Sequence, residues 1–164
     1  MRDYLEQVTR GLDANLYYLS LAAALTIPDM CAGLESPDGL TNASKYKAWY
    51  EEHCADVCAF LTGEDCYYYR CSMLHRGTSQ HPKSSFSRVL FVEPGVTTNV
   101  FHCNLMNDAL NIDVNVFCRA IVQAADSWLD RVEGTDPYES NAAKFMRRYV
   151  SGLRPYIVGV PVIS

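Results

Sequence analysis

The chain has 164 residues, a net charge of −5 and 49% hydrophobic residues. This length fits one ordinary domain, residues 1–164, with a core that needs no covalent support. The negative charge excludes a protein that coats nucleic acid non-specifically, because phosphate neutralisation requires a basic surface.

Apolar residues recur at steps of three and four from Leu5 to Ala23, which predicts a long amphipathic first helix. We expect Pro28 to end it, and residues 28–42 to form a connection rich in proline and glycine. The apolar run 16–27 is shorter than the ~20 residues that a membrane-spanning helix needs. The start of the chain also lacks the apolar segment of a secretory signal. We therefore expect a cytoplasmic protein without a membrane segment.

Two more helices are predicted in the first half of the chain. One covers residues 44–60. The next follows Thr62, a residue type that caps helices, and its first turn holds two acids, which the helix dipole favours. Gly77 is placed to end this helix in the left-handed conformation.

A β-hairpin is predicted after a polar loop at 78–85. The segments 88–92 and 97–103 have the composition of strands, and the turn dipeptide Pro94-Gly95 lies between them. The hairpin therefore covers about 86–104.

Two helices and a tail are predicted to follow. Asp113 can cap a helix whose apolar residues keep the three-four spacing. Asp136 and Pro137 are typical of a helix start, and the apolar stripe of this last helix runs over 138–149. The apolar tail after Pro155 is expected to lie against the body or a partner. The sequence thus predicts a mainly α fold: a bundle of four to five helices with an inserted β-hairpin.

The seven cysteines are interpreted as reduced thiols that mostly fill the core. Cys54 and Cys58 share one helix face, with His53 adjacent and Cys66 nearby, which zinc could use. The paired CxxC spacing of zinc sites is absent, however. We favour core thiols and predict no metal site.

Two other groups of residues could carry chemistry. Tyr67, Tyr68 and Tyr69 could stack on bases, although such a run more often straddles a helix and is partly buried. His102 and Cys103 suggest a thiol–imidazole pair, but neighbours on a strand point to opposite faces, so we expect them not to meet.

Arg70 and His75 are five residues apart near the end of a predicted helix. At ~1.5 Å and ~100° per residue they are roughly 7.5 Å apart along the axis and ~140° apart around it. They converge if the helix relaxes near its end or if a second copy of the motif faces the first. A phosphate could then bind between a planar cation and an imidazole that moves protons. In a purely structural interpretation, Arg70 pairs with Asp65 or Glu64 and His75 caps the helix.

The segment Arg70-Cys71-Ser72-Met73-Leu74-His75 resembles the Arg-x4-6-His motif of the HEPN superfamily. Members are all-helical, usually dimeric proteins, and many are metal-independent endoribonucleases. The resemblance implies that Arg70 holds the scissile phosphate of RNA and that His75 transfers protons. Attack by the ribose 2′-hydroxyl would leave a 2′,3′-cyclic phosphate. It also implies a homodimer with a composite site and no cofactor.

The basic residues become denser around this motif. From Arg70 to Arg88 the chain carries no acidic residue. We predict that Arg76, His81 and Lys83 contact the substrate.

Three hypotheses for function follow. The first is an RNA-cleaving homodimer in a toxin or defence role, held in check by an antitoxin or a nucleotidyltransferase-like protein partner. The second is a catalytically silent HEPN-like module that binds RNA, a nucleotide or a protein. Cys71 favours the second, because many active members have a polar residue there, whereas the joint presence of Arg70 and His75 favours the first. The third is a purely structural helical protein.

Overall fold

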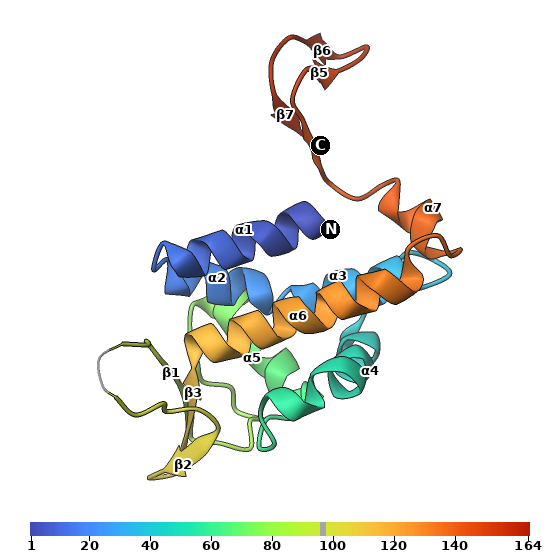
Figure 1. Cartoon of the computed structure of the whole chain (residues 1–164). Helices are drawn as coiled ribbons and strands as arrows, with labels where there is room; N and C mark the ends of the chain where they lie inside the picture. Colours follow the sequence, from blue (N-terminus) through green and yellow to red (C-terminus); the bar gives the residue numbers. More distant parts are fainter. Residues whose placement is uncertain (96–97) are drawn as a thin grey trace.

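The protein is described from a computed structural model that covers residues 1–95 and 98–164. Its helices gather in one body, and the end of the chain projects away from that body as an arm (Figure 1). The helical elements are α1 (Arg2–Asp13), α2 (Tyr17–Ala24), α3 (Ile27–Leu34), α4 (Ala43–Cys54), the short 3₁₀ helix η1 (Ala55–Val57), α5 (Gly63–Arg76), α6 (Val114–Val132) and α7 (Tyr138–Ala142). The predicted mainly α class is confirmed, whereas a bundle of four to five helices with a hairpin is not.

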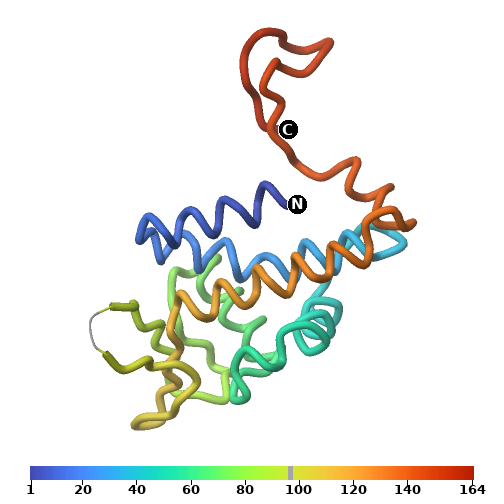
Figure 2. The backbone as a smooth tube through the Cα atoms, viewed as in Figure 1, coloured from blue at the N-terminus to red at the C-terminus, as the bar shows by residue number. Residues whose placement is uncertain are grey.

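Helix α6 runs through the middle of the body and packs against α1, α2, α3 and α4 (Figure 2). Its apolar stripe is fully buried, with Phe117, Ile121 and Trp128 among the largest side chains of the core. Trp128 meets Trp49 of α4 edge to face, with ring centroids 6.2 Å apart. Burial of this one stripe therefore holds α1, α2, α3 and α4 around α6.

The predicted first helix is divided in two. Asn15 has a φ of 58° between α1 and α2, and Asn tolerates this left-handed conformation better than most residues. Pro28 also does not end a helix, because it lies in the first turn of α3. Proline is accepted there because the first N–H groups of a helix have no partner in it.

The hairpin predicted at about 86–104 is not formed by its two segments. β1 (Arg88–Val92) exists as expected, but it pairs in parallel with β3 (Ala109–Asp113). Residue 97 lies outside the described residues, and 98–103 contain no strand. β2 (Asn104–Met106) and β3 form the actual hairpin, and the order in the sheet is β1-β3-β2.

Two residues with left-handed backbone explain the β2–β3 turn. Asn107 and Asp108 have φ angles of 49° and 60°. A two-residue hairpin turn with φ positive at both positions matches the twist of its strands, and Asn and Asp are favoured in it. The pair Asn-Asp was the overlooked sequence signal.

Several predicted helix boundaries are confirmed. Thr62 Oγ1 accepts a hydrogen bond from the Asp65 N–H, and the Asp113 carboxylate accepts one from the Val116 N–H. Gly77 has a φ of 62° and ends α5. The helix predicted over 44–60 ends earlier, at Cys54, and η1 continues it.

The last helix differs from its prediction. Its N-cap is Pro137 rather than Asp136, and the helix is five residues long instead of reaching residue 149. Asn141 is turned inward, where its side-chain amide donates to the carbonyl oxygens of Leu34 (3.0 Å) and Ser36 (2.8 Å). Helix α7 thus stabilises the C-terminal end of α3.

The tail does not lie against the body but extends from it (Figure 1). Four two-residue strands pair within it, namely β4 (Arg148–Tyr149) with β7 (Val162–Ile163), and β5 (Gly152–Leu153) with β6 (Ile157–Val158). Tyr156 and Ile163 are among its exposed apolar residues. The alternative that a partner covers the tail stays a prediction.

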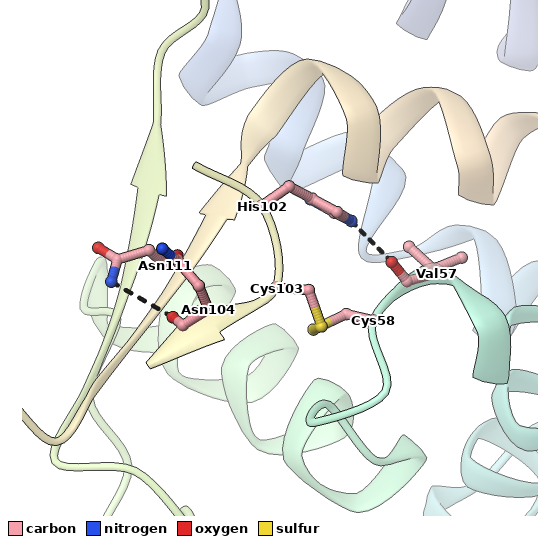
Figure 3. The surroundings of a disulfide bond; sticks show 6 residues. All are labelled: Val57, Cys58, His102, Cys103, Asn104 and Asn111. Atoms are coloured by element: carbon pink, nitrogen blue, oxygen red, sulfur yellow. Dashed lines mark hydrogen bonds between the residues drawn. A yellow bond between two sulfur atoms is a disulfide. The ribbon is translucent and has the colours of Figure 1, made fainter. Parts of the chain in front are cut away.

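The interpretation of all cysteines as reduced thiols is wrong for two of them. Cys58 and Cys103 form a disulfide, with Cα atoms 5.2 Å apart (Figure 3). It ties the chain after η1 to the segment before β2, a proximity that the sequence does not reveal. Four of the remaining cysteines are buried, as expected of core thiols: Cys31, Cys54, Cys66 and Cys118. Disulfides are typical of oxidising compartments, and the cytoplasmic location stays a prediction.

By length and composition, the stretch Tyr17–Leu34 could cross a membrane. It comprises α2 and α3, and 56% of it is buried inside the structure. A core helix meets the same criteria, so the absence of a membrane segment stays a prediction.

Candidate functional site: the outer face of α5

The N-terminus of α5 is held against α4. The Gly63 N–H donates to Glu51 Oε1 at 2.5 Å. A Cβ atom at Gly63 would lie 2.6 Å from the Lys47 carbonyl oxygen, so this close approach of the two helices requires glycine. The helix that carries Arg70 and His75 is thereby fixed at its start.

One side of α5, the inner face (Asp65, Tyr69 and Ser72), is buried. Asp65 accepts hydrogen bonds from the backbone N–H of Ser85 (3.0 Å) and from the Thr62 hydroxyl (2.8 Å). The hydroxyls of Tyr69 and Ser84 are 2.5 Å apart. These contacts fasten the predicted polar loop 78–85 to the helix.

The opposite side, the outer face (Tyr67, Arg70, Cys71, Leu74 and His75), is partly or fully exposed. Arg70 Nη1 lies 3.4 Å from His75 Nε2, so the two motif residues meet within one helix. The ~140° divergence of their backbone positions does not keep them apart, because the long arginine side chain reaches across. Convergence therefore needs no second copy of the chain.

Asp29 holds Arg70 in place. Its Oδ2 accepts from Arg70 Nε at 2.7 Å, and the side chains are 12% and 23% exposed, respectively. The partner of Arg70 is thus neither Asp65 nor Glu64. The sequence does not reveal this partner, because Asp29 lies 41 positions from Arg70, in a segment predicted to be a connection. An aspartate directly after a proline, in the first turn of α3, was the available signal.

Neighbouring groups shift the pKa values of two side chains at this site, Arg70 and Tyr67. Burial alone would lower the pKa of Arg70, but the neighbouring Asp29 and Cys71 outweigh it, and the pKa is raised. A hydrogen bond with Cys71, followed by burial, raises the pKa of Tyr67. Since Arg70 Nη1 is always a donor, a hydrogen bond in this contact requires the His75 tautomer that carries its proton on Nδ1.

Arg76 does not join the outer face. Six positions beyond Arg70, it points about 120° away from it around the helix. Its Nη2 donates to the Ser72 hydroxyl at 3.0 Å and to the Gln80 carbonyl at 3.3 Å. Arg76 therefore braces the loop, and a role in substrate binding stays a prediction.

His81 and Lys83 lie beside the first half of α5. The His81 ring stacks on Tyr68, with centroids 4.3 Å apart, and its Nδ1 accepts from the Lys83 N–H at 3.2 Å. Tyr68 in turn donates to Glu64, which also pairs with Lys47. His81, with Lys83 bonded to it, therefore lies at Tyr68, which is seven positions before His75 on α5. The two predicted substrate contacts thus form a group separate from the Arg70–His75 pair.

The tyrosine run straddles the helix, as in the more common interpretation. Tyr69 is buried, and Tyr67 and Tyr68 are half-buried. His102 and Cys103 do not lie on a strand, and Cys103 has a φ of 55°. His102 Nε2 is 2.7 Å from the Val57 carbonyl oxygen. Cys103 is bonded to Cys58 and is therefore not a free thiol (Figure 3).

Within residues 1–95 and 98–164, no three His, Cys, Asp or Glu side chains gather in a metal-binding group. Cys58, one of the cysteines weighed as a zinc ligand, belongs to the disulfide. The chain matches no family model, no curated protein and no solved structure. Function is therefore inferred from the geometry of the outer face.

Proposed function

We propose that the protein is a metal-independent endoribonuclease of HEPN type that acts through Arg70 and His75. The observation that carries this proposal is the 3.4 Å contact between the guanidinium and the imidazole on an exposed helix face. Asp29 fixes the guanidinium through Nε, which leaves the Nη edge directed toward His75 and solvent. A phosphate that binds this edge takes the place of the imidazole and frees Nε2 to accept a proton.

Two copies of the chain together supply the base and the acid that cleavage requires. The ribose 2′-oxygen attacks phosphorus and loses its proton to one His75, while the bond from phosphorus to the 5′-oxygen breaks. The imidazolium of the second copy's His75 gives its proton to the departing 5′-oxygen. The products are a 2′,3′-cyclic phosphate and a free 5′-hydroxyl, and Arg70 stabilises the charge that develops on the phosphate.

The alternative is a silent module that binds RNA, a nucleotide or a protein. One observation favours it: Arg70 is already paired with Asp29, so that part of its charge is compensated before a ligand arrives. In this alternative the outer face binds a phosphate without cleaving the strand. The toxin or defence role and its protein partner belong to the first proposal.

Cleavage of labelled RNA, with and without chelator, tests the proposal. The wild-type chain should cleave in chelator and leave a cyclic phosphate, and His75→Ala should lose about 10²–10⁴-fold in rate. Arg70→Lys should not restore the activity lost in Arg70→Ala, because a point charge cannot hold two phosphate oxygens in one plane. Arg119→Ala is the matched control, because Arg119 also pairs with one aspartate, Asp13, at the surface.

Two outcomes count against the enzyme. Cleavage that disappears in chelator and returns with magnesium would show a different mechanism. Full cleavage by a folded His75→Ala variant would remove His75 from the reaction. Light scattering supplies a separate test of the dimer, since a chain that stays monomeric at high concentration cannot supply the second imidazole.

A further inference from the structure

A cavity of about 430 Å³ has Asp29, the ion-pair partner of Arg70, in its wall. Its volume is within the range of pockets that bind small ligands. Asp29 belongs both to the cavity wall and to the Arg70 ion pair. The Arg70 ion pair and the cavity therefore share one carboxylate, which brings the two features together at α3. The wall is formed by α3, the connection after α3, and the segment that includes and follows α7.

The cavity combines apolar walls with a few polar groups. Met30, Leu40 and Phe145 supply apolar and aromatic surface. Asp38 is exposed, but its Oδ1 is fixed by the Leu40 N–H at 3.0 Å and by Lys45 Nζ at 3.1 Å. These two donors, the backbone one first, lower the pKa of Asp38, so the carboxylate is ionised at neutral pH. Such a lining suits a flat, polar-edged ring.

We infer that this cavity binds the base of a nucleotide whose phosphate lies at Arg70, and that it prefers guanine. Guanine carries two adjacent N–H donors, on its ring and on its exocyclic amino group, and the carboxylate of Asp38 accepts both when one of them takes the place of Lys45 Nζ on Oδ1. Its carbonyl oxygen can accept from Lys144, which also lines the cavity. Uracil has one N–H between two carbonyl oxygens, and a carboxylate repels these. Adenine and cytosine place an acceptor next to their amino group.

This inference rests on the proposed function only in sharing a phosphate at Arg70, and it also holds if the chain binds nucleotides without cleaving them. It is tested by calorimetric titration of the whole protein with guanosine monophosphate and with uridine monophosphate. The guanine nucleotide should bind roughly ten-fold more tightly, the discrimination that a two-bond contact to a base supplies. Equal affinities for the two nucleotides would overturn the base site.

Asp38→Asn is the decisive variant. It keeps the shape of the side chain but presents an amide N–H₂ to the donors of guanine, so the preference over uridine monophosphate should disappear. Asp13→Asn is the matched control, because Asp13 is 62% exposed and paired with Arg119, while Asp38 is 58% exposed and paired with Lys45. A preference that survives Asp38→Asn, or one that Asp13→Asn removes equally, would contradict the assignment.

RNA substrates separate the two proposals. In the ribonuclease assay, RNA strands should be cut next to guanosine. In Asp38→Asn, the cleavage rates next to the four nucleotides should become equal. Cleavage without base preference would refute the cavity and leave the enzyme in place. Guanine-selective binding without any cleavage would refute the enzyme and leave the cavity as the site of a silent nucleotide-binding module.

Discussion

The two faces of α5 belong to the same 14 residues, yet they are built in different ways. The inner face buries Asp65, which is 2% exposed, and satisfies it with hydrogen bonds from Ser85 of the loop and from the Thr62 hydroxyl at the start of the helix. The outer face holds Arg70 and His75 with one ion pair and one longer contact. Buried polar groups are costly to disturb, whereas exposed ones are not. The inner face therefore supports the fold, and the outer face is free to bind a ligand.

The largest expected effect concerns the disulfide, which closes the segment that contains α5. Replacing Cys58 and Cys103 by serine removes a cross-link over 45 positions, and the free energy of unfolding should fall by about 4 kcal/mol. Denaturant titration measures this loss, and reducing agent should produce it in the wild type but not in the double variant. If unfolded, unreduced protein shows seven free thiols instead of five, the bond is absent.

A slightly smaller effect is expected at Asp65 on the inner face. Asp65→Ala leaves the Ser85 N–H and the Thr62 hydroxyl without their acceptor, which should cost about 3 kcal/mol of unfolding free energy. Glu64→Ala, one position earlier on the exposed side, should change stability little. Equal losses in the two variants would erase the distinction between the faces.

Tyr69→Phe should remove about 1 kcal/mol, the contribution of its hydrogen bond with Ser84. Burial raises the pKa of Tyr69 to about 12, above its ordinary value of 10. The unfolded chain therefore loses this proton first, and stability decreases as the pH rises from 10 to 12. Stability curves over this range should decline less steeply for Tyr69→Phe. Parallel curves would mean that the hydroxyl is not buried.

The smallest expected effect on stability is at the outer face. His75→Ala should stay within about 0.5 kcal/mol of the wild type, because the ring is exposed. Arg70→Ala should cost more than His75→Ala, since it removes the positive charge that pairs with the mostly buried Asp29. Thermal melts measure both. Should His75→Ala unfold the protein instead, the motif would be structural, as the third hypothesis from the sequence states.

Local signals explain which of these features the sequence predicts. The caps at Thr62 and Asp113 and the end of α5 at Gly77 each depend on residues within one helical turn. The pair Arg70–Asp29 and the disulfide join segments 41 and 45 positions apart, which no local pattern encodes. The sequence could thus identify the motif but not what holds it.

The parallel pairing of β1 with β3 could not be predicted for the same reason, because no local pattern encodes it. Its two strands are separated by the segment that includes β2, and nothing in their composition distinguishes a parallel partner from the nearer strand that was predicted. The turn at Asn107 and Asp108 could have been predicted, because its residue types demand a left-handed backbone.

The disulfide also determines how the protein responds to force. Residues 58–103 form a covalent ring that contains the whole of α5, including Arg70 and His75. A pull on the two ends of the chain can straighten the polypeptide outside this ring but cannot extend the ring itself. The fully stretched molecule would therefore be about 150 Å shorter than the reduced one. The motif segment would be mechanically shielded as long as the bond stays oxidised.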